Sequence, residues 1–241
     1  FPFGCIVALV VATILGVIGI FAIGFPRGVD AGDGCVITRG GDITGSADSG
    51  YVWLTPLESK KCYTLRPITY ETVIGDDPRV STAQYKSQAP DAGSSDGQKI
   101  LRVPYRIIFH IPAAMPELDP KTCQPVMTKD KDGNDVPKVI RENNVEWVYE
   151  NVGTNIDVIV KTVAETATVP QIKQVMQLYT SESLFSGDLA KPQTDVFTRL
   201  CPVYARYGVQ LDQFLLSRPQ FNEAFEAVIE APRLEEDMLR L

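Results

Sequence analysis

A long apolar run near the start of the sequence limits what this chain can fold into. Residues 3–25 read FGCIVALVVATILGVIGIFAIGF, which is 23 residues without a charged or strongly polar side chain. As a helix this run would be about 34 Å long, enough to cross the hydrocarbon core of a bilayer. A cleaved signal peptide has a shorter apolar region and a basic start. The sequence therefore predicts a transmembrane helix over residues 1–26, with the orientation left open because the flanking charges do not decide it.

The bulk composition fits an ordinary globular protein and excludes one class of partner. The chain has 241 residues, 44% of them apolar and 22% charged, so it can bury a core in one or two domains. Its net charge is −7, without a cluster of basic residues, which argues against nonspecific binding to nucleic acid. Because the sequence begins with Phe and ends inside a helical pattern, we expect it to be part of a longer protein.

A strand-rich region follows the apolar run. Val, Ile, Thr and Tyr are enriched in four segments, which predicts strands over 34–41, 50–57, 60–75 and 98–111. Two polar inserts interrupt them: residues 76–97 are predicted to be a loop, and residues 121–138 an extended hairpin around Asp132-Gly133. We expect a small antiparallel β-domain next to the membrane.

The hydrophobic period changes from two to about 3.6 after Asn151, which predicts helices. Pro170 is expected near the start of the second helix, and Pro202 is expected to bend or shorten the third. The apolar faces are Ile156, Val160, Val163 and Ala167 for the first helix; Ile172, Val175, Met176 and Tyr179 for the second; and Val196, Leu200, Val203 and Tyr207 for the third.

A junction between two helices is predicted in the stretch ARYGVQLDQFLLSRPQ. Gly208 is expected to end the third helix, because glycine adopts the left-handed conformation at little cost. Residues 209–216 then alternate like an edge strand. Ser217 and Gln220 have the spacing of an S-x-x-Q capping box, which predicts a new helix entering a coiled-coil-like segment.

Candidate catalytic motifs are present only as fragments. GSSDG at 93–97 fits G-x-S-x-G with Ser95 as nucleophile, but it lies in a polar loop instead of between a strand and a helix. His110, the only histidine, falls in an apolar strand pattern, where a structural or surface role is expected. We therefore predict no catalytic residues, no bound cofactor and no enzymatic activity.

The candidate metal ligands do not form a recognisable site either. DKDGND at 130–135 begins like a calcium loop, yet Asp135 stands at the glycine position and Arg141 at the position of the bidentate Glu. Cysteines 5, 35, 62, 123 and 201 lack zinc or redox spacing. They are interpreted as small buried hydrophobic residues, with a Cys35–Cys62 disulfide as an open alternative.

Four stretches together resemble the stomatin/prohibitin/flotillin (SPFH, band 7) superfamily. The first is the glycine-rich DAGDGCVITRGG directly after the apolar run. The second, GYVWLTPLESKKCYTL, is similar to the glycine–aromatic–proline strand pair of the family, with Gly50, Trp53 and Pro56 in the matching places. The others are the tyrosine-bearing strand VPYRIIFHIP and the helix–glycine–strand–helix element YARYGVQLDQFLLSRP.

The resemblance implies a membrane-anchored, non-enzymatic scaffold that oligomerises into a large ring or cage and organises a membrane microdomain. Its expected partners are copies of itself or close paralogues, membrane lipids and, in some members, a membrane protease, but not nucleic acid. One alternative is a regulator or adaptor subunit that encloses a membrane-bound protease. A remote alternative is a single-span hydrolase that uses Ser95 or a cysteine.

The predicted fold class is α+β, with a transmembrane helix, a β-rich part, an α/β part and the start of a long helix. The expected divisions are a transmembrane helix at 1–26, a membrane-proximal β-rich subdomain at 27–120, an inserted hairpin or loop at 121–139, an α/β subdomain at 140–217 and the start of a C-terminal helix at 218–241.

Overall fold

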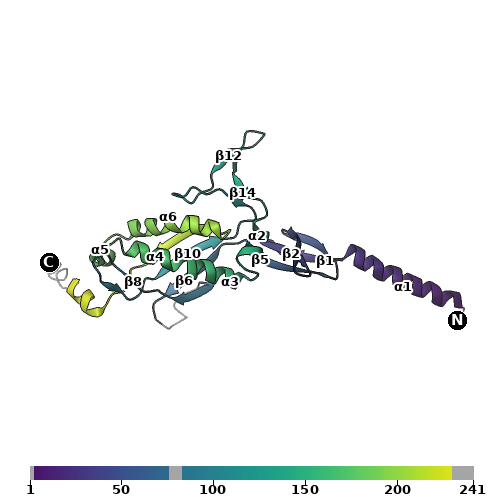
Figure 1. Ribbon diagram of the computed structural model, residues 1–241, viewed down its shortest axis with the longest axis horizontal. Helices are drawn as coiled ribbons and strands as arrows, with labels where there is room; N and C mark the ends of the chain where they lie inside the picture. Colours follow the sequence, from purple (N-terminus) through teal and green to yellow (C-terminus); the bar gives the residue numbers. More distant parts are fainter. Residues whose placement is uncertain (1–2, 76–82, 230–241) are drawn as a thin grey trace, which may run out of the picture.

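The computed structural model describes residues 3–75 and 83–229. The molecule is elongated: helix α1, Phe3–Ile23, lies at one end, a small β-rich part follows, and a sheet covered by helices forms the larger body (Figure 1). The helical residues 223–229 lie at the opposite end. This is a mixed α+β arrangement with several antiparallel sheets.

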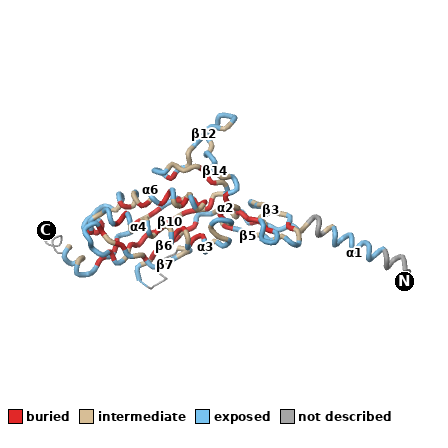
Figure 2. Tube along the Cα trace, viewed as in Figure 1, coloured by how far each residue is buried: buried red, intermediate tan, exposed pale blue. Residues whose placement is uncertain are grey.

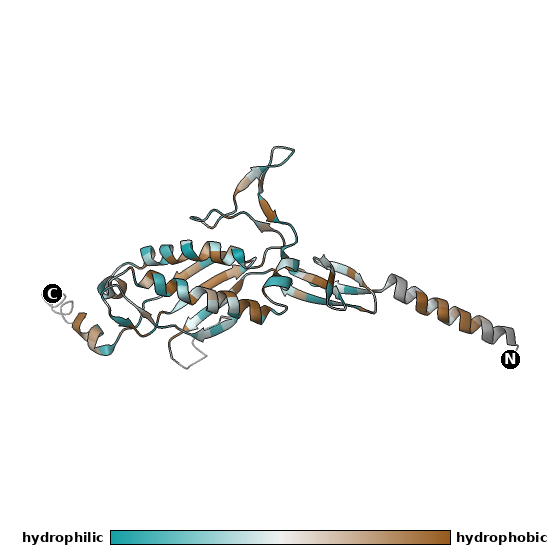
Figure 3. Cartoon of the chain, in the orientation of Figure 1, coloured by the Kyte–Doolittle hydropathy of each residue, from teal (hydrophilic) through white to brown (hydrophobic). Residues whose placement is uncertain are grey.

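The predicted transmembrane helix requires correction. Within the described part of the chain, no helix is both long enough and apolar enough to cross a membrane. The side chains described in α1 are those of residues 8–19. The predicted fold class is therefore wrong in this element. These residues are nonetheless mostly hydrophobic, as the colouring of Figure 3 shows, and mostly exposed.

Two small sheets follow α1. Strand β1, Phe25–Val29, pairs with β4, Gly50–Leu54, as a two-stranded ribbon. Strand β2, Asp33–Arg39, lies between β3, Asp42–Ala47, and β5, Glu58–Thr64. Both sheets are antiparallel, as the sequence predicted for this region.

The main sheet has the order β15-β10-β6-β7. Its strands are β6, Ile68–Val73; β7, Tyr85–Gln88; β10, Tyr105–His110; and β15, Gln210–Leu216. Tyr105, Ile107 and Phe109 alternate into the core along β10, which lies between β6 and β15. Strands β6 and β10, which the sequence interpretation grouped with the membrane-proximal part, therefore form one sheet with β15. The β6–β7 pair is parallel.

Part of the predicted loop over 76–97 is strand. Besides β7, this stretch contains β8, Ala92–Gly93, which pairs with β9, Lys99–Ile100. The loop prediction is wrong at β7 and β8, where Ala92 is buried and the four residues of β7 pair with β6. Residues 76–82 lie outside the described part of the chain.

Helices cover the main sheet, and the buried residues lie along both layers (Figure 2). The apolar residues of the two layers form one core cluster. The Tyr105 hydroxyl donates to the Ala164 carbonyl at 3.0 Å, joining β10 to the helical layer. The helices are α2, Asn144–Asn151; α3, Ile156–Val160; the π-helix η2, Lys161–Ala167; α4, Thr168–Met176; α5, Ser181–Ser186; and α6, Ala190–Arg206.

The helix boundaries differ from the sequence prediction in two places. The expected first and second helices form one continuous helical stretch from α3 to α4, and Pro170 lies inside it, three residues after the π-helix η2. Pro202 does not shorten α6, which continues to Arg206. Buried Leu200 and Tyr204 on either side of this proline hold the helix against the core.

An arm, residues 115–141, projects from the body (Figure 1). At its base β11, Met115–Pro116, pairs with β14, Val139–Arg141. Its tip is the hairpin of β12, Met127–Lys129, and β13, Asp135–Pro137, which is where the sequence predicts a hairpin. The Asp130 carboxylate accepts the amide hydrogens of Asp132 and Asn134, so the apparent calcium-loop motif folds as a hydrogen-bonded turn.

The predicted capping box at Ser217 and Gln220 does not form. Pro219 disfavours helix at Arg218, and the backbone of Gln220 instead exchanges hydrogen bonds with Arg102. The helix begins at residue 223, where the Asn222 side chain accepts the Ala224 amide hydrogen at 2.9 Å. The start of the C-terminal helix is therefore corrected by five residues, and residues 230–241 lie outside the described part.

Gly208 has the predicted conformation at the end of α6. Its φ is +68°, and the chain passes through it into β15. A Cβ on this residue would lie 2.7 Å from Asn144 Oδ1, 2.7 Å from Val148 Cγ2 and 3.1 Å from the Trp147 ring. Gly208 thus provides both a left-handed turn and room for α2.

We expect Gly208→Ala to destabilise the fold in two ways. A non-glycine residue in the left-handed region costs about 1–2 kcal/mol, and crowding against α2 adds about 1–3 kcal/mol. Urea unfolding followed by circular dichroism measures the sum. Gly97→Ala is the matched control, because Gly97 has φ of +78° with open space around its Cβ position. Equal losses in the two variants would contradict the proposed close packing at Gly208.

Candidate functional site

The clearest surface feature is an exposed apolar rim beside the end of α1. We define the rim as Phe25, Tyr51, Trp53 and Leu57, whose exposed fractions range from 45% to 84%. In the β1–β4 ribbon Tyr51 lies opposite Gly28, and Trp53 lies opposite Pro26. Cross-strand partners share a face of the sheet, and Gly28 has no side chain that could cover the Tyr51 ring. The two aromatic side chains are therefore exposed to solvent and accessible to a binding partner.

The residues chosen from the sequence in this region belong to the same ribbon and turn. Gly50 begins β4 with φ of +125°, a conformation that L side chains rarely adopt. Trp53 lies in β4, and Pro56 is exposed in the turn that follows. That turn is closed by the Thr55 amide, which donates to the Glu58 carboxylate at 2.8 Å, and a backbone hydrogen bond returns from Glu58 to Thr55.

The ribbon lies directly against the end of α1. A Cβ built on Gly24 would lie 2.5 Å from the Leu54 carbonyl oxygen, so the chain leaving α1 passes close to β4. The described part of α1 carries further exposed apolar side chains. Figure 3 shows this helix, coloured as hydrophobic, next to the β-rich part of the molecule. The large apolar residues of α1 that are exposed are Leu9, Val10, Val11, Ile14, Leu15, Val17 and Ile18.

The catalytic fragments are placed in structural roles. The His110 ring contacts the Asp212 carboxylate across β10 and β15, with Nδ1 and Oδ2 2.8 Å apart. Ser95 lies in the turn between β8 and β9, and its amide donates to the Tyr179 carbonyl at 2.8 Å. The G-x-S-x-G stretch thus folds as a β-turn rather than as the strand-to-helix elbow of a hydrolase. The sequence did not reveal Asp212 as the partner of His110.

Asp96 explains what the GSSDG stretch does in the fold. Its carboxylate accepts hydrogen bonds from the Ser181 hydroxyl and amide at the start of α5, and from the Ser94 hydroxyl. The Ser181 hydroxyl first, then the Ser94 hydroxyl, lower the pKa of Asp96 from its ordinary range to about 2. The turn therefore docks onto α5 through one ionised carboxylate.

A buried asparagine that the sequence analysis did not single out holds the arm base to the Gly208 junction. The Asn144 side-chain amide donates to the Pro112 carbonyl at 2.8 Å and to the Gly208 carbonyl at 2.7 Å. Its oxygen accepts from Arg141 at 3.0 Å, and the Arg141 guanidinium lies 3.7 Å from the centre of the Trp147 ring. No sequence motif distinguishes Asn144 from an ordinary residue at the start of a helix.

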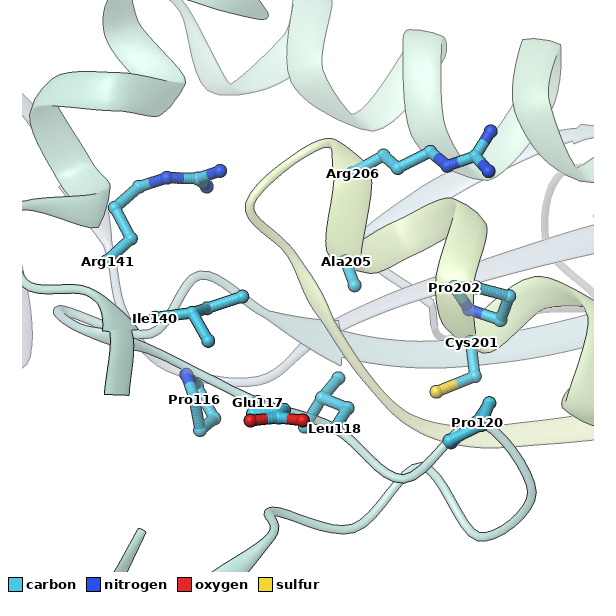
Figure 4. A pocket seen from close by; sticks show the side chains of 10 residues that line it. All are labelled: Pro116, Glu117, Leu118, Pro120, Ile140, Arg141, Cys201, Pro202, Ala205 and Arg206. Atoms are coloured by element: carbon cyan, nitrogen blue, oxygen red, sulfur yellow. The ribbon is translucent and has the colours of Figure 1, made fainter. Parts of the chain in front are cut away.

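A pocket of about 340 Å³ separates the arm base from the C-terminal part of α6 (Figure 4). Apolar side chains dominate its walls. The lining residue Glu117 pairs with Lys138 at 2.5 Å. The lining comprises Pro116, Glu117, Leu118, Pro120, Ile140, Arg141, Cys201, Pro202, Ala205 and Arg206.

The cysteines depart most clearly from the sequence interpretation. Cys35 and Cys62 form a disulfide between β2 and β5, the alternative that the sequence left open. Cys123 and Cys201 form a second disulfide between the arm and α6. Their interpretation as unpaired hydrophobic residues is therefore wrong for these four. The second pair was missed because its members are 78 residues apart and the spacing carries no motif.

We expect the Asp96 contact to stabilise the fold in a pH-dependent way. Because the pKa of Asp96 is lowered in the folded chain, its contribution is present above pH ~4, the unfolded value, and is lost as pH falls through about 2. Ser181→Ala should raise the pKa of Asp96 and reduce this acid-dependent loss. NMR titration of the Asp96 carboxyl and urea unfolding between these pH values measure both effects.

Ser183→Ala is the control for this prediction. Ser183 lies on the same short helix, but its hydroxyl donates to the Thr180 carbonyl rather than to Asp96. A pKa of Asp96 that remains near 2 in Ser181→Ala would contradict the assigned cause.

Comparison with known proteins covers nearly the whole chain. Residues 28–239 match the family model described as SPFH domain / Band 7 family. A search of curated proteins found no match. The matched region includes the end of β1, all of β4, the main sheet, the arm and the helices from α2 to α6. Since the match spans far more than half of the sequence, the chain belongs to the SPFH domain / Band 7 family.

Proposed function

We propose that this protein is a membrane-associated, non-enzymatic scaffold that assembles with copies of itself into a large ring or cage and thereby organises a patch of membrane. The apolar rim beside α1 is the observation that carries the proposal. Membership of the SPFH domain / Band 7 family supports it, because the family is membrane-associated and its members are generally non-enzymatic scaffolds.

The composition of the rim favours a lipid surface as its partner. Tyr and Trp are enriched where proteins meet the interface between headgroups and acyl chains, because their rings combine an apolar body with a polar tip. Tyr51 is 84% exposed and Trp53 is 58% exposed, although both are large enough to be buried at a substantial gain in free energy. Contact with a bilayer surface would remove this apolar area from water.

The shape of the molecule is consistent with side-by-side assembly. The rim and α1 lie at one end of an elongated molecule, so copies that stand on one membrane can contact each other along their long sides (Figure 1). Such contacts between unlike faces close into a ring only when the rotation between neighbours completes a circle. A scaffold of this kind has no need of a catalytic group.

Membrane contact at the rim can be tested by the fluorescence of Trp53. The chain contains two tryptophans, so Trp147→Phe leaves Trp53 as the only one. Its emission should shift to shorter wavelength when phospholipid vesicles are added, because the ring leaves water. Adding Tyr51→Ser and Leu57→Ser to this variant should reduce the shift, since both remove apolar area from the rim.

The complementary variant, Trp53→Phe, is the control. It keeps Trp147, which is half-buried beneath Arg141 and away from the rim, so its emission should not respond to vesicles. Unchanged Trp53 emission with vesicles of both zwitterionic and anionic phospholipid would contradict the proposed membrane contact.

Assembly is tested by light scattering in a mild detergent. We expect particles whose mass corresponds to many copies of the chain, because a ring closes only with its full number of subunits. A monomer at every protein concentration would refute the ring or cage, while leaving the result for Trp53 unaffected.

A further inference from the structure

Four of the five cysteines are joined in two bridges that tie together separate parts of the chain. Cys35 and Cys62 face each other directly in the β2–β5 register. Cys123 of the arm and Cys201 of α6 have Cα atoms 5.6 Å apart, within the usual range for a disulfide. Both members of the second pair are 1% exposed, so this bridge is buried.

The backbone at Cys123 gives independent evidence that the second bridge is a built feature. Its φ is +56°, and it is the only non-glycine residue with positive φ in the described ranges. An L side chain is disfavoured in this region, where glycine or asparagine is the usual residue. A cysteine is explained at this position by the bond that its sulfur makes to Cys201.

The surrounding turn holds Cys123 in that conformation. The Asp119 carboxylate accepts the Lys121 amide hydrogen at 2.7 Å, and the Cys123 amide donates to the Asp119 carbonyl at 2.8 Å. The Asp119 amide in turn donates to the Gln124 carbonyl at 2.9 Å. The turn over 119–124 is thus closed by hydrogen bonds and then fixed to α6 by the disulfide, beside Pro120 and Pro202 (Figure 4).

Cysteine pairs of this kind stay oxidised only in certain compartments. Glutathione and thioredoxin keep thiols reduced in the cytosol of most organisms, whereas secreted, periplasmic and lumenal proteins keep their disulfides. One bridge uses Cys123, which has a left-handed backbone conformation, and the other uses Cys35, which lies in the central strand β2. These positions indicate a chain adapted to an oxidising environment. The cysteines of the two bridges are distributed from β2 to α6, so the same environment applies to the whole body between them.

We propose that the body of this protein lies in an oxidising compartment, on the side of the membrane away from the reducing cytosol, where the Cys123–Cys201 bridge locks the arm onto α6. This inference does not depend on assembly into a ring. The chemical partner is a thiol–disulfide oxidant of that compartment. For each bridge, one cysteine thiolate attacks the disulfide of the oxidant and forms a mixed disulfide with it. The second cysteine thiolate then attacks the sulfur of the first cysteine and displaces the oxidant. Two protons and two electrons leave the cysteine pair, and the oxidant departs as a dithiol.

The compartment is tested on the full chain in intact cells. Cells are quenched with acid, their free thiols are blocked with N-ethylmaleimide, and the protein is digested without reductant for mass spectrometry. We expect the peptides containing Cys35 and Cys62 to be joined, and likewise those containing Cys123 and Cys201. Blocked, unpaired thiols at these four positions, or bridges that form only when quenching is omitted, would overturn the assignment.

The lock on the arm is tested by limited trypsin digestion of the native protein. Cleavage after Lys121 reports opening of the 119–124 turn, and cleavage after Lys131 at the arm tip is the internal reference. In Cys201→Ser we expect cleavage after Lys121 to rise on the order of tenfold, because the turn opens locally without its covalent tie. Cys62→Ser, which breaks only the other bridge, should keep the slow rate of the unmodified chain.

A second variant separates the lock from a folding defect. Cys123→Gly combined with Cys201→Ala removes the bridge and suits the positive φ at position 123. It should fold and still show fast cleavage after Lys121. Slow cleavage of this variant, equal to that of the unmodified chain, would overturn the lock.

Discussion

Burial of one strand determines the arrangement of most of the chain. β10 lies between β6 and β15, and its inward side chains Tyr105, Ile107 and Phe109 are almost fully removed from water. Such a strand needs a neighbour on each edge and a layer above it. The helices from α3 to α6 supply that layer, and the Tyr105 hydroxyl satisfies its hydrogen bond at the Ala164 carbonyl. The arm is attached to this core by local contacts and by the Cys123–Cys201 disulfide, whereas the Cys35–Cys62 disulfide lies within the β-rich end.

The sequence predicted those elements whose information is local. Alternation along residues 105–110, the helical period around Leu200 and the turn glycine at 208 are all visible within a few residues, and the structure has a strand, a helix and a positive φ there. Pairings between distant segments were not predictable in this way. Nothing in the spacing of Cys123 and Cys201, or of His110 and Asp212, shows that the chain brings them together.

The corrections have a common physical basis, because tertiary contacts override local signals. Ser217 and Gln220 have the residue types of a helix cap, but Gln220 is taken up by backbone pairing with Arg102, and the helix begins at residue 223. Pro202 should weaken a helix, yet buried neighbours keep α6 intact. For the candidate surface, Trp53 could be chosen from the sequence. Its exposure beside Gly28 and Pro26 became clear only from the register of the ribbon.

The hydrogen bonds of Asn144 have a mechanical consequence. One side chain receives Arg141 from the root of the arm and donates to the carbonyl of Gly208, where α6 passes into β15. Asn144 therefore contacts both the base of the arm and the residue that precedes β15. A neighbour that pulls on the arm tip therefore loads the joint that leads, through β15, to the far end of the molecule. A tilt of the arm that moves Arg141 changes its hydrogen bond to the Asn144 oxygen first, and is felt at Gly208 only through the Asn144 amide nitrogen.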